Sequence, residues 1–225
     1  RRVLFRSNVA CALARLGTPV AFAGRLGCDP IGEAFTALLA ERGVNLAVLQ
    51  RDAERPSRIV LVQRDASGDR SFGGFAGDQG AGFADQALDA DALAEALPPL
   101  LAQARWLQIG SIPLATPASG AALQRAVQLA LASGVALALD VNWRPTFWDA
   151  AAPADAGPSA AALAAMAPLL EQAALLKLAA EEAQWLFGTA DPQAIAAALP
   201  QRPAVLVTDG GQQLAWCMAG CSGAL

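Results

Sequence analysis

The sequence predicts an α/β fold in which helices flank a mostly parallel central sheet and a small β lid lies beside it. Three observations predict this fold. Short apolar runs typical of buried strands alternate with longer segments whose apolar residues recur at helical spacing. The 225 residues, 55% of them hydrophobic, are enough for one sizeable core. Two β-rich runs around ASGD interrupt the alternation, which favours a hairpin.

The first elements follow an order of helix, strand and helix. Ser7 is a candidate N-cap for a helix whose apolar residues fall at helical spacing, and Gly17 ends it. The run PVAFAGRLG predicts a strand that enters a glycine-bounded turn. Pro30 opens the next helix, and Gly43 ends it. The hairpin is expected from the two β-rich runs within residues 58–75.

The remaining elements continue the alternation to the end of the chain. We expect strands at 106–110, 135–140, 175–178 and 204–211, and helices at 89–97, 118–133, after Ser159, at 181–188 and at 191–199. The alanine- and proline-rich loop 149–158 is expected to be a flexible linker. The sequence contains no internal repeat. We therefore expect a single domain over 1–225, with the lid at about 48–78.

Composition excludes several classes of function. The net charge of -4 leaves no basic stripe for a nucleic-acid backbone, and no run of about 18 apolar residues predicts a membrane span. Without histidine the chain cannot use a Ser-His or Cys-His nucleophile system or an imidazole metal ligand. Because histidine is absent, any general base is expected to be a carboxylate. Four cysteines without a CxxC pair favour reduced thiols and a cytoplasmic location.

The stretch DVNWRPTFW, residues 140–148, places polar side chains directly after a predicted buried strand. In open α/β sheets, ligands bind outside the carboxyl ends of the strands. The polar cluster is therefore either part of a functional site or an ordinary solvated loop.

Four blocks in order resemble the PfkB (ribokinase-like) sugar kinases: NVACALARLG, GRLGCDPIGE, DVNWRPTFW, and LLKLAAEEAQWLFG followed by VLVTDGG. The hairpin RIVLVQRDASGDRSFGGF resembles the lid of this family and is most similar to fructokinases. The resemblance implies a ribokinase-like fold and transfer of the γ-phosphate of ATP, with Mg²⁺, to a sugar hydroxyl. The sequences of the hairpin and of DVNWRP favour fructose as the sugar.

The resemblance gives roles to three residues of DVNWRPTFW, at the place where sugar and γ-phosphate meet. Arg144 would stabilise charge on the transferring phosphoryl group, because a guanidinium is always charged and presents forked donors. Asn142 would orient the acceptor or a phosphate-bound water, and Asp140 would contact the substrate. Alternatively, Arg144 pairs with Asp140 or Asp149 and only steadies the loop.

Three residues nearer the N-terminus are implied to bind the sugar. Asn8 would hydrogen-bond a hydroxyl, or it simply occupies the first turn of a helix. Asp29 matches the family's Gly-x-Asp-x-x-Gly turn, although we favour a structural role as the N-cap of the helix at Pro30. Phe72, together with Phe75, would close over the sugar and exclude water, or the rings are simply packed in the hairpin.

Four residues are implied to lie near the nucleotide: Lys177, Glu182, Thr208 and Gly210. Glu182 matches the acidic residue of the family's Asn-x-x-Glu motif and would act on Mg²⁺ indirectly, through water. The Asn of that motif is Ala179 here, which weakens the assignment. In VLVTDGG, a strand would deliver Thr208, and Gly210 would let the backbone approach phosphate.

Both ends of the chain depart from the family pattern. The Gly-Ala-Gly-Asp segment, which supplies the anion-binding amides and the catalytic Asp, is not in the 225 residues. RRVLFRS stands where the family has its first strand and a Gly-Gly turn, so we expect a fragment of a kinase. We predict that residues 1–225 alone show no ATP-dependent sugar phosphorylation above background. Measured turnover by the purified chain would contradict this.

Two other functions compete with the kinase. A non-catalytic PfkB-like protein could use the fold for sugar or nucleotide binding or for regulation. A Rossmann-type dinucleotide-binding protein fits the alternation but lacks a Gly-x-Gly-x-x-Gly between a first strand and helix. We expect a small-molecule sugar as substrate and no nucleic acid or membrane partner. A homodimer through the open strand edges of the lid is plausible.

Overall fold

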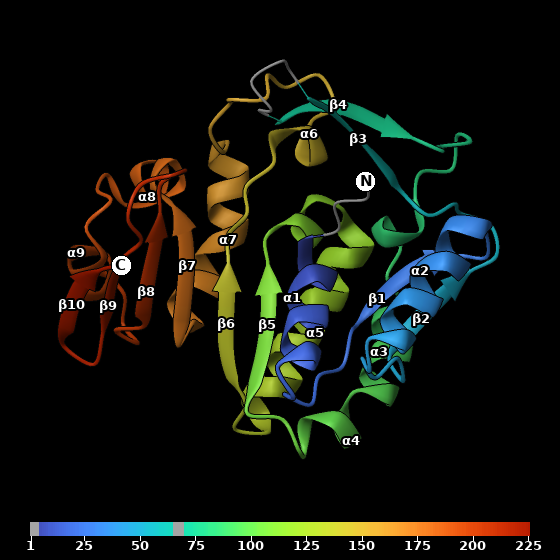
Figure 1. Cartoon of the computed structure of the whole chain (residues 1–225), viewed down its shortest axis with the longest axis horizontal. Helices are drawn as coiled ribbons and strands as arrows, with labels where there is room; N and C mark the ends of the chain where they lie inside the picture. Colours follow the sequence, from blue (N-terminus) through green and yellow to red (C-terminus); the bar gives the residue numbers. More distant parts are fainter. Residues whose placement is uncertain (1–4, 65–69) are drawn as a thin grey trace. The chain divides into compact units, whose positions relative to one another are not determined.

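The computed structural model describes residues 5–64 and 70–225. The chain divides into two compact units, the first ending at Leu100 and the second running from Leu101 to Leu225. The single domain expected over 1–225 stays a prediction. The elements of both units are labelled in Figure 1.

The first unit contains helices, a parallel strand pair and a separate antiparallel pair (Figure 1). β1 pairs in parallel with β2, and β3 pairs antiparallel with β4. In chain order, its elements are α1 (Phe5–Arg15), β1 (Gly24–Gly27), α2 (Pro30–Glu41), β2 (Leu49–Asp52), β3 (Ile59–Arg64), β4 (Arg70–Ala76), the short 3-10 helix η1 (Ala84–Gln86), α3 (Ala90–Ala96) and α4 (Pro98–Leu101), which ends at the boundary.

The core of the first unit joins α1 to α2. Ala10, Phe35, Leu39 and Val44 are buried together, and partly buried apolar side chains pack around them. The ring of Phe22 meets that of Phe35 edge-on, with centroids 6.2 Å apart. Because apolar residues of α2 recur at helical spacing, one face of the helix enters this core.

Two expectations for this region are wrong and one element was missed. Ser7 does not cap a helix, because α1 begins at Phe5 and Ser7 lies buried inside it. The first strand is limited to β1 and begins only at Gly24, whereas Ala21 forms an isolated bridge to Asn45. β2 was missed because four residues are too few to show a period.

The hairpin predicted within 58–75 is confirmed by β3 and β4. The register shifts between Leu61 and Val62, so β4 carries a bulge. Phe72 lies in β4 opposite Val62, while its side chain and residues 65–69, which include the whole predicted turn ASGD, lie outside the described part. The Phe75 ring packs against Phe83, with centroids 6.2 Å apart. Phe75 therefore has a packing role.

A turn in which backbone segments lie close together follows β1 and explains its two glycines. The Gly27 amide donates to the Ser57 hydroxyl at 3.0 Å. A side chain on Gly27 would lie 2.7 Å from the Arg55 carbonyl oxygen, and one on Gly32 would overlap the Gly27 carbonyl oxygen. Asp29 caps α2 by accepting from the Gly32 amide at 2.8 Å, which confirms the predicted N-cap.

Gly32→Ala is expected to lower the free energy of unfolding by about 1–3 kcal/mol, because the new methyl meets backbone that cannot rotate away. Gly211→Ala is the matched control, since Gly211 has open space around its Cβ position and no positive φ. Urea denaturation of both variants measures the difference. Equal stability of the two variants would contradict this account of the turn.

The second unit is built on one six-stranded sheet of order β10-β9-β8-β7-β6-β5. β5 to β8 are parallel, and the last two strands are antiparallel, so the predicted mostly parallel sheet is confirmed. The strands are β5 (Trp106–Gly110), β6 (Ala136–Asp140), β7 (Leu175–Ala179), β8 (Ala204–Thr208), β9 (Ala215–Met218) and β10 (Cys221–Ala224). Leu137, Leu176 and Val205 are fully buried in neighbouring strands.

Helices connect and flank these strands (Figure 1). They are η2 (Ile112–Ala115), α5 (Pro117–Ala132), α6 (Pro145–Trp148), α7 (Ala160–Gln172), α8 (Ala180–Phe187) and α9 (Pro192–Ala198). The expected linker 149–158 does not separate the two units. It lies inside the second unit, where the Ala156 carbonyl accepts from the Trp143 indole at 2.7 Å. Over the described ranges, no helix has both the length and the hydropathy that a membrane span requires.

Candidate functional site

The candidate site lies at the carboxyl edge of the sheet in the second unit. Asp140 ends β6, Ala179 ends β7 and Thr208 ends β8. The parallel register pairs Asp140 with Lys177 and Ala179 with Thr208, so these strand ends are neighbours. This edge is where an open parallel sheet binds its ligands.

An ion pair joins the ends of β6 and β7. The Lys177 Nζ lies 3.3 Å from the Asp140 Oδ1. Asp140 is buried, whereas Lys177 is partly exposed. The carboxylate therefore has a cationic partner within the site, and the pair presents one positive and one negative group at the same place.

Asn142 is a buried polar residue with an uncommon backbone conformation. Its φ of 45° lies in the left-handed region, and its side chain is 5% exposed. Asn tolerates this region better than other residues with a side chain, and such conformations gather at functional sites. The turn directs the chain from β6 into α6, so Asn142 and Arg144 both depend on it.

Trp143, which the sequence analysis did not single out, lies between these two residues and is held at three points. Its amide donates to Glu182 Oε1 at 2.6 Å, and its indole nitrogen donates to the Ala156 carbonyl at 2.7 Å. Its ring packs on Trp148, with centroids 5.4 Å apart. The letter W in DVNWRP marked an aromatic residue but did not show that it was buried.

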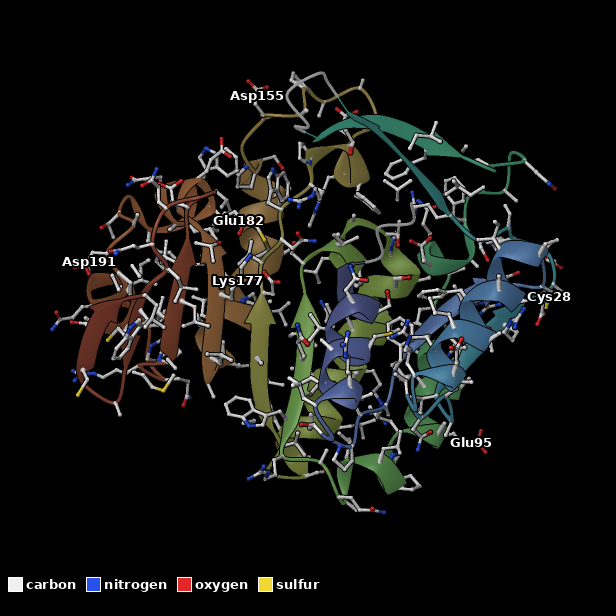
Figure 2. All side chains as sticks on the ribbon, viewed as in Figure 1. Cys28, Glu95, Asp155, Lys177, Glu182 and Asp191 are labelled. Carbon is white, nitrogen blue, oxygen red and sulfur yellow. The ribbon has the colours of Figure 1, made fainter. Side chains whose placement is uncertain are left out.

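Glu182 is a buried carboxylate that links two segments. It lies in the first turn of α8, close to Lys177 on β7, and both residues are labelled in Figure 2. Its Oε1 accepts from the Trp143 amide, and its Oε2 accepts from the Ala179 amide at 2.8 Å. Burial raises the pKa of Glu182, whereas the two amides and Lys177 oppose the rise.

The raised pKa predicts a pH dependence of stability. The folded protein binds the Glu182 proton more tightly than the unfolded chain, whose value is near 4.5, so the contribution of Glu182 favours folding at low pH. This contribution is lost as pH rises from 4.5 through the raised pKa. The difference in unfolding free energy between the unmodified protein and Glu182→Gln is expected to fall over that window. Urea denaturation between pH 4 and 8 measures it.

Glu181→Gln is the control for this pH profile, because Glu181 is exposed beside Glu182 on the same helix turn. Its difference from the unmodified protein should stay nearly constant. A Glu182→Gln difference that rises with pH would show that the sign is wrong.

Arg144 occupies the N-cap position of α6 and is exposed. Its guanidinium donates to the Trp143 carbonyl at 2.6 Å. To the residues that the structure describes, Arg144 makes no ion pair, and Asp140 is instead paired with Lys177. The alternative in which Arg144 pairs with Asp140 or Asp149 is therefore not observed among these residues.

The remaining two residues assigned to the nucleotide lie beside this cluster along the sheet edge. The Thr208 hydroxyl donates to the Leu178 carbonyl at 3.3 Å. Gly210 has a φ of 51° and open space around its Cβ position. The positive φ accounts for glycine in the turn after β8.

The other predicted residues belong to the first unit. Asn8 is exposed in the first turn of α1. Both carboxylate oxygens of Asp29 accept backbone hydrogen bonds, Oδ1 from Gly32 and Oδ2 from Ser57 at 2.5 Å. Burial opposes ionisation of Asp29, but these amides outweigh it and lower its pKa. Binding of sugar by Asn8, Asp29 and Phe72 stays a prediction.

The donor set of the second unit suits a polyphosphate better than a protein-held metal ion. Arg144 and Lys177 supply two cations at the strand ends. In residues 5–64 and 70–225, no three acidic or cysteine side chains cluster as a metal cage would require. Mg²⁺ usually binds through waters and substrate phosphates, so a role for Mg²⁺ does not require such a cage.

Comparison with known proteins finds a matching family. The model of the pfkB family carbohydrate kinases matches residues 6–222. The fructokinase of Vibrio alginolyticus is 33% identical over 142 residues, which cover 63% of this chain and 43% of that protein. The matched region therefore spans less than half the length of that relative.

Solved structures extend the comparison to almost the whole chain. The fructokinase of Xylella fastidiosa with bound ATP is 27% identical with a TM-score of 0.77, covering 97% of this chain and 66% of that chain. A putative ribokinase from E. coli is 20% identical with a TM-score of 0.79, with the same two shares covered. The ribokinase-like fold expected from the sequence is confirmed.

Proposed function

Because the chain belongs to the pfkB family of carbohydrate kinases, we propose that it is part of an enzyme that transfers the γ-phosphate of ATP to a sugar hydroxyl. The observation that carries the proposal is the grouping at one sheet edge of the Asp140–Lys177 pair, the left-handed Asn142 and the exposed Arg144. Fructose is the proposed acceptor, since the hairpin resembles that of fructokinases and the Vibrio and Xylella relatives are fructokinases.

In this proposal the protein mainly positions groups and stabilises charge. Phosphoryl transfer spreads negative charge over three phosphoryl oxygens, and Arg144 presents a guanidinium that no described carboxylate neutralises. Asn142 orients the acceptor hydroxyl, because an amide can both donate and accept. Lys177 partly neutralises Asp140, which reduces repulsion between this carboxylate and an incoming phosphate.

ATP supplies the phosphoryl group, and Mg²⁺ would neutralise charge on its phosphates. Lys177, Thr208 and Gly210 are the residues proposed to lie along the nucleotide, and the family resemblance gives Glu182 an indirect role with Mg²⁺, through water. The family resemblance assigns the proton-accepting Asp to a Gly-Ala-Gly-Asp segment that is not among the 225 residues.

We also propose a cytoplasmic location and a homodimer through the hairpin.

The test is to read the coding sequence in both directions from this chain, express the resulting reading frame and measure ADP release with a panel of sugars. Fructose is expected to stimulate ADP release most, with ribose and a no-sugar reaction as comparisons. ADP release that no sugar stimulates would contradict the kinase proposal. Sugar or nucleotide binding without turnover would instead support the non-catalytic alternative.

A further inference from the structure

We propose that Glu182 is a positioning residue, which acts through Trp143 to hold Asn142 and Arg144 in the geometry that the reaction requires. This inference rests on the proposed kinase function and deepens it. Three contacts of Trp143 carry it: its amide donates to Glu182, its indole nitrogen donates to the Ala156 carbonyl, and its ring packs on Trp148.

Glu182 connects the end of β7 to the chain that follows Val141, whose amide still donates to the Lys177 carbonyl at 3.2 Å. One oxygen accepts from Ala179, at the end of β7, and the other accepts from Trp143, three residues after β6. The carboxylate is 5% exposed, so both bonds lie away from competing water. A charge-assisted hydrogen bond in such surroundings is strong and directional.

Trp143 transmits this constraint to its two neighbours in the chain. Its amide, its indole nitrogen and its ring are each held by a different partner, and the residue is 6% exposed. Asn142, immediately before it, adopts the left-handed conformation, and Arg144, immediately after it, begins α6 and donates to the Trp143 carbonyl. A shift of Trp143 would therefore displace both side chains.

The chemistry of Glu182 supports a functional reason for keeping it. A buried carboxylate is costly to desolvate, and Glu182 is only 5% exposed. Glu181, its neighbour, is exposed, so the same turn of α8 could present an acidic side chain to solvent without this cost. Since each Glu182 oxygen already accepts a backbone amide, the positioning role requires no metal ion.

The experiment uses the protein from the reading frame assayed above, with Glu182→Ala, Glu182→Gln and the matched control Glu181→Ala. Amide hydrogen exchange is measured first, without Mg²⁺ or nucleotide. Protection of the Trp143 amide is expected to fall at least about tenfold in Glu182→Ala and to be unchanged in Glu181→Ala. Glu182→Gln keeps one acceptor oxygen and is expected to lie between them.

Steady-state kinetics then separate positioning from a merely structural or metal-linked role. Glu182→Ala is expected to lower kcat about 100-fold, the scale of a displacement of about 1 Å, with the KM for ATP changed less than about threefold. The loss should persist at saturating Mg²⁺. Glu182→Gln should recover part of the rate, which also covers the case in which the Ala variant does not fold.

Three results would overturn the inference: unchanged Trp143 protection in both Glu182 variants, an unchanged kcat despite lost protection, or recovery of the rate with excess Mg²⁺. If the unmodified protein phosphorylates no sugar, the kinase proposal fails. The hydrogen exchange result then still decides whether Glu182 holds Trp143 in place.

Discussion

Arg144→Ala is expected to lower kcat for sugar phosphorylation by about 1000-fold, while the free energy of unfolding changes by less than about 0.5 kcal/mol. The side chain is exposed and makes no ion pair with a described residue, so its removal costs little in the ground-state structure. Its charge would be needed only where negative charge spreads over the transferring phosphoryl group. ADP release at saturating fructose and ATP measures the effect.

Arg144→Lys tests whether charge alone is sufficient. Lysine keeps the charge but loses the forked donors, so only a small part of the rate should return. Arg105→Ala is the control, because Arg105 is an exposed arginine that precedes β5, away from the carboxyl edge of the sheet. An Arg144→Ala variant with more than about a tenth of the original kcat would contradict the proposed role.

Asp52→Ala is expected to lower the free energy of unfolding by about 3 kcal/mol, because it leaves two backbone amides and two partly exposed arginines without the buried carboxylate that they share. Asp52 is 2% exposed at the end of β2, and its Oδ2 lies 3.0 Å from the Arg25 Nε and 3.5 Å from the Arg55 guanidinium. Its Oδ1 accepts from the amides of Glu54 and Arg55. Urea denaturation of the variant and of the unmodified protein, followed by far-UV circular dichroism, measures the loss.

The same residue gives a second measurement with a defined sign. Burial opposes ionisation of Asp52, but the Arg55 and Glu54 amides and the Arg25 charge outweigh it and hold its pKa below 3.8. The stabilisation is therefore present above pH 3.8 and is lost as pH falls through the lowered pKa. Asp52→Asn should lack this acid-dependent part. Glu41→Ala, an exposed change at the end of α2, is the control.

Most elements of the fold could be predicted because local sequence determines them. β5 coincides with its predicted span, and α2 begins at the predicted Pro30 with the predicted Asp29 cap. Misses occurred where local signals were short or ambiguous. Four-residue β2 shows no period, and Ser7 resembles a cap although the helix already began at Phe5. An N-cap residue must itself have a non-helical, usually extended backbone, and Ser7 lies inside the helix.

The candidate site was predicted in part for the same reason. A strand followed by Asp140, Asn142 and Arg144 indicated a ligand-binding edge, and the structure places this strand end beside that of β7. The sequence left open whether Arg144 pairs with Asp140 or Asp149, and it indicated no carboxylate partner for Lys177. It also ranked Glu182 only as a residue near Mg²⁺ and left Trp143 out. Contacts between residues 39 positions apart depend on how strands are ordered in the sheet.

The sequence by itself determined the α/β class, the positions of most helices and strands, and the family to which they belong, because these depend on periodicity, caps and ordered motifs within short windows. Only the tertiary structure decided that Asp140 pairs with Lys177, that Asn142 turns left-handed, and that Glu182 holds the Trp143 amide. These features arise from burial and from contacts between distant segments. Such contacts stabilise the protein only after the sheet has formed and has brought the strand ends together.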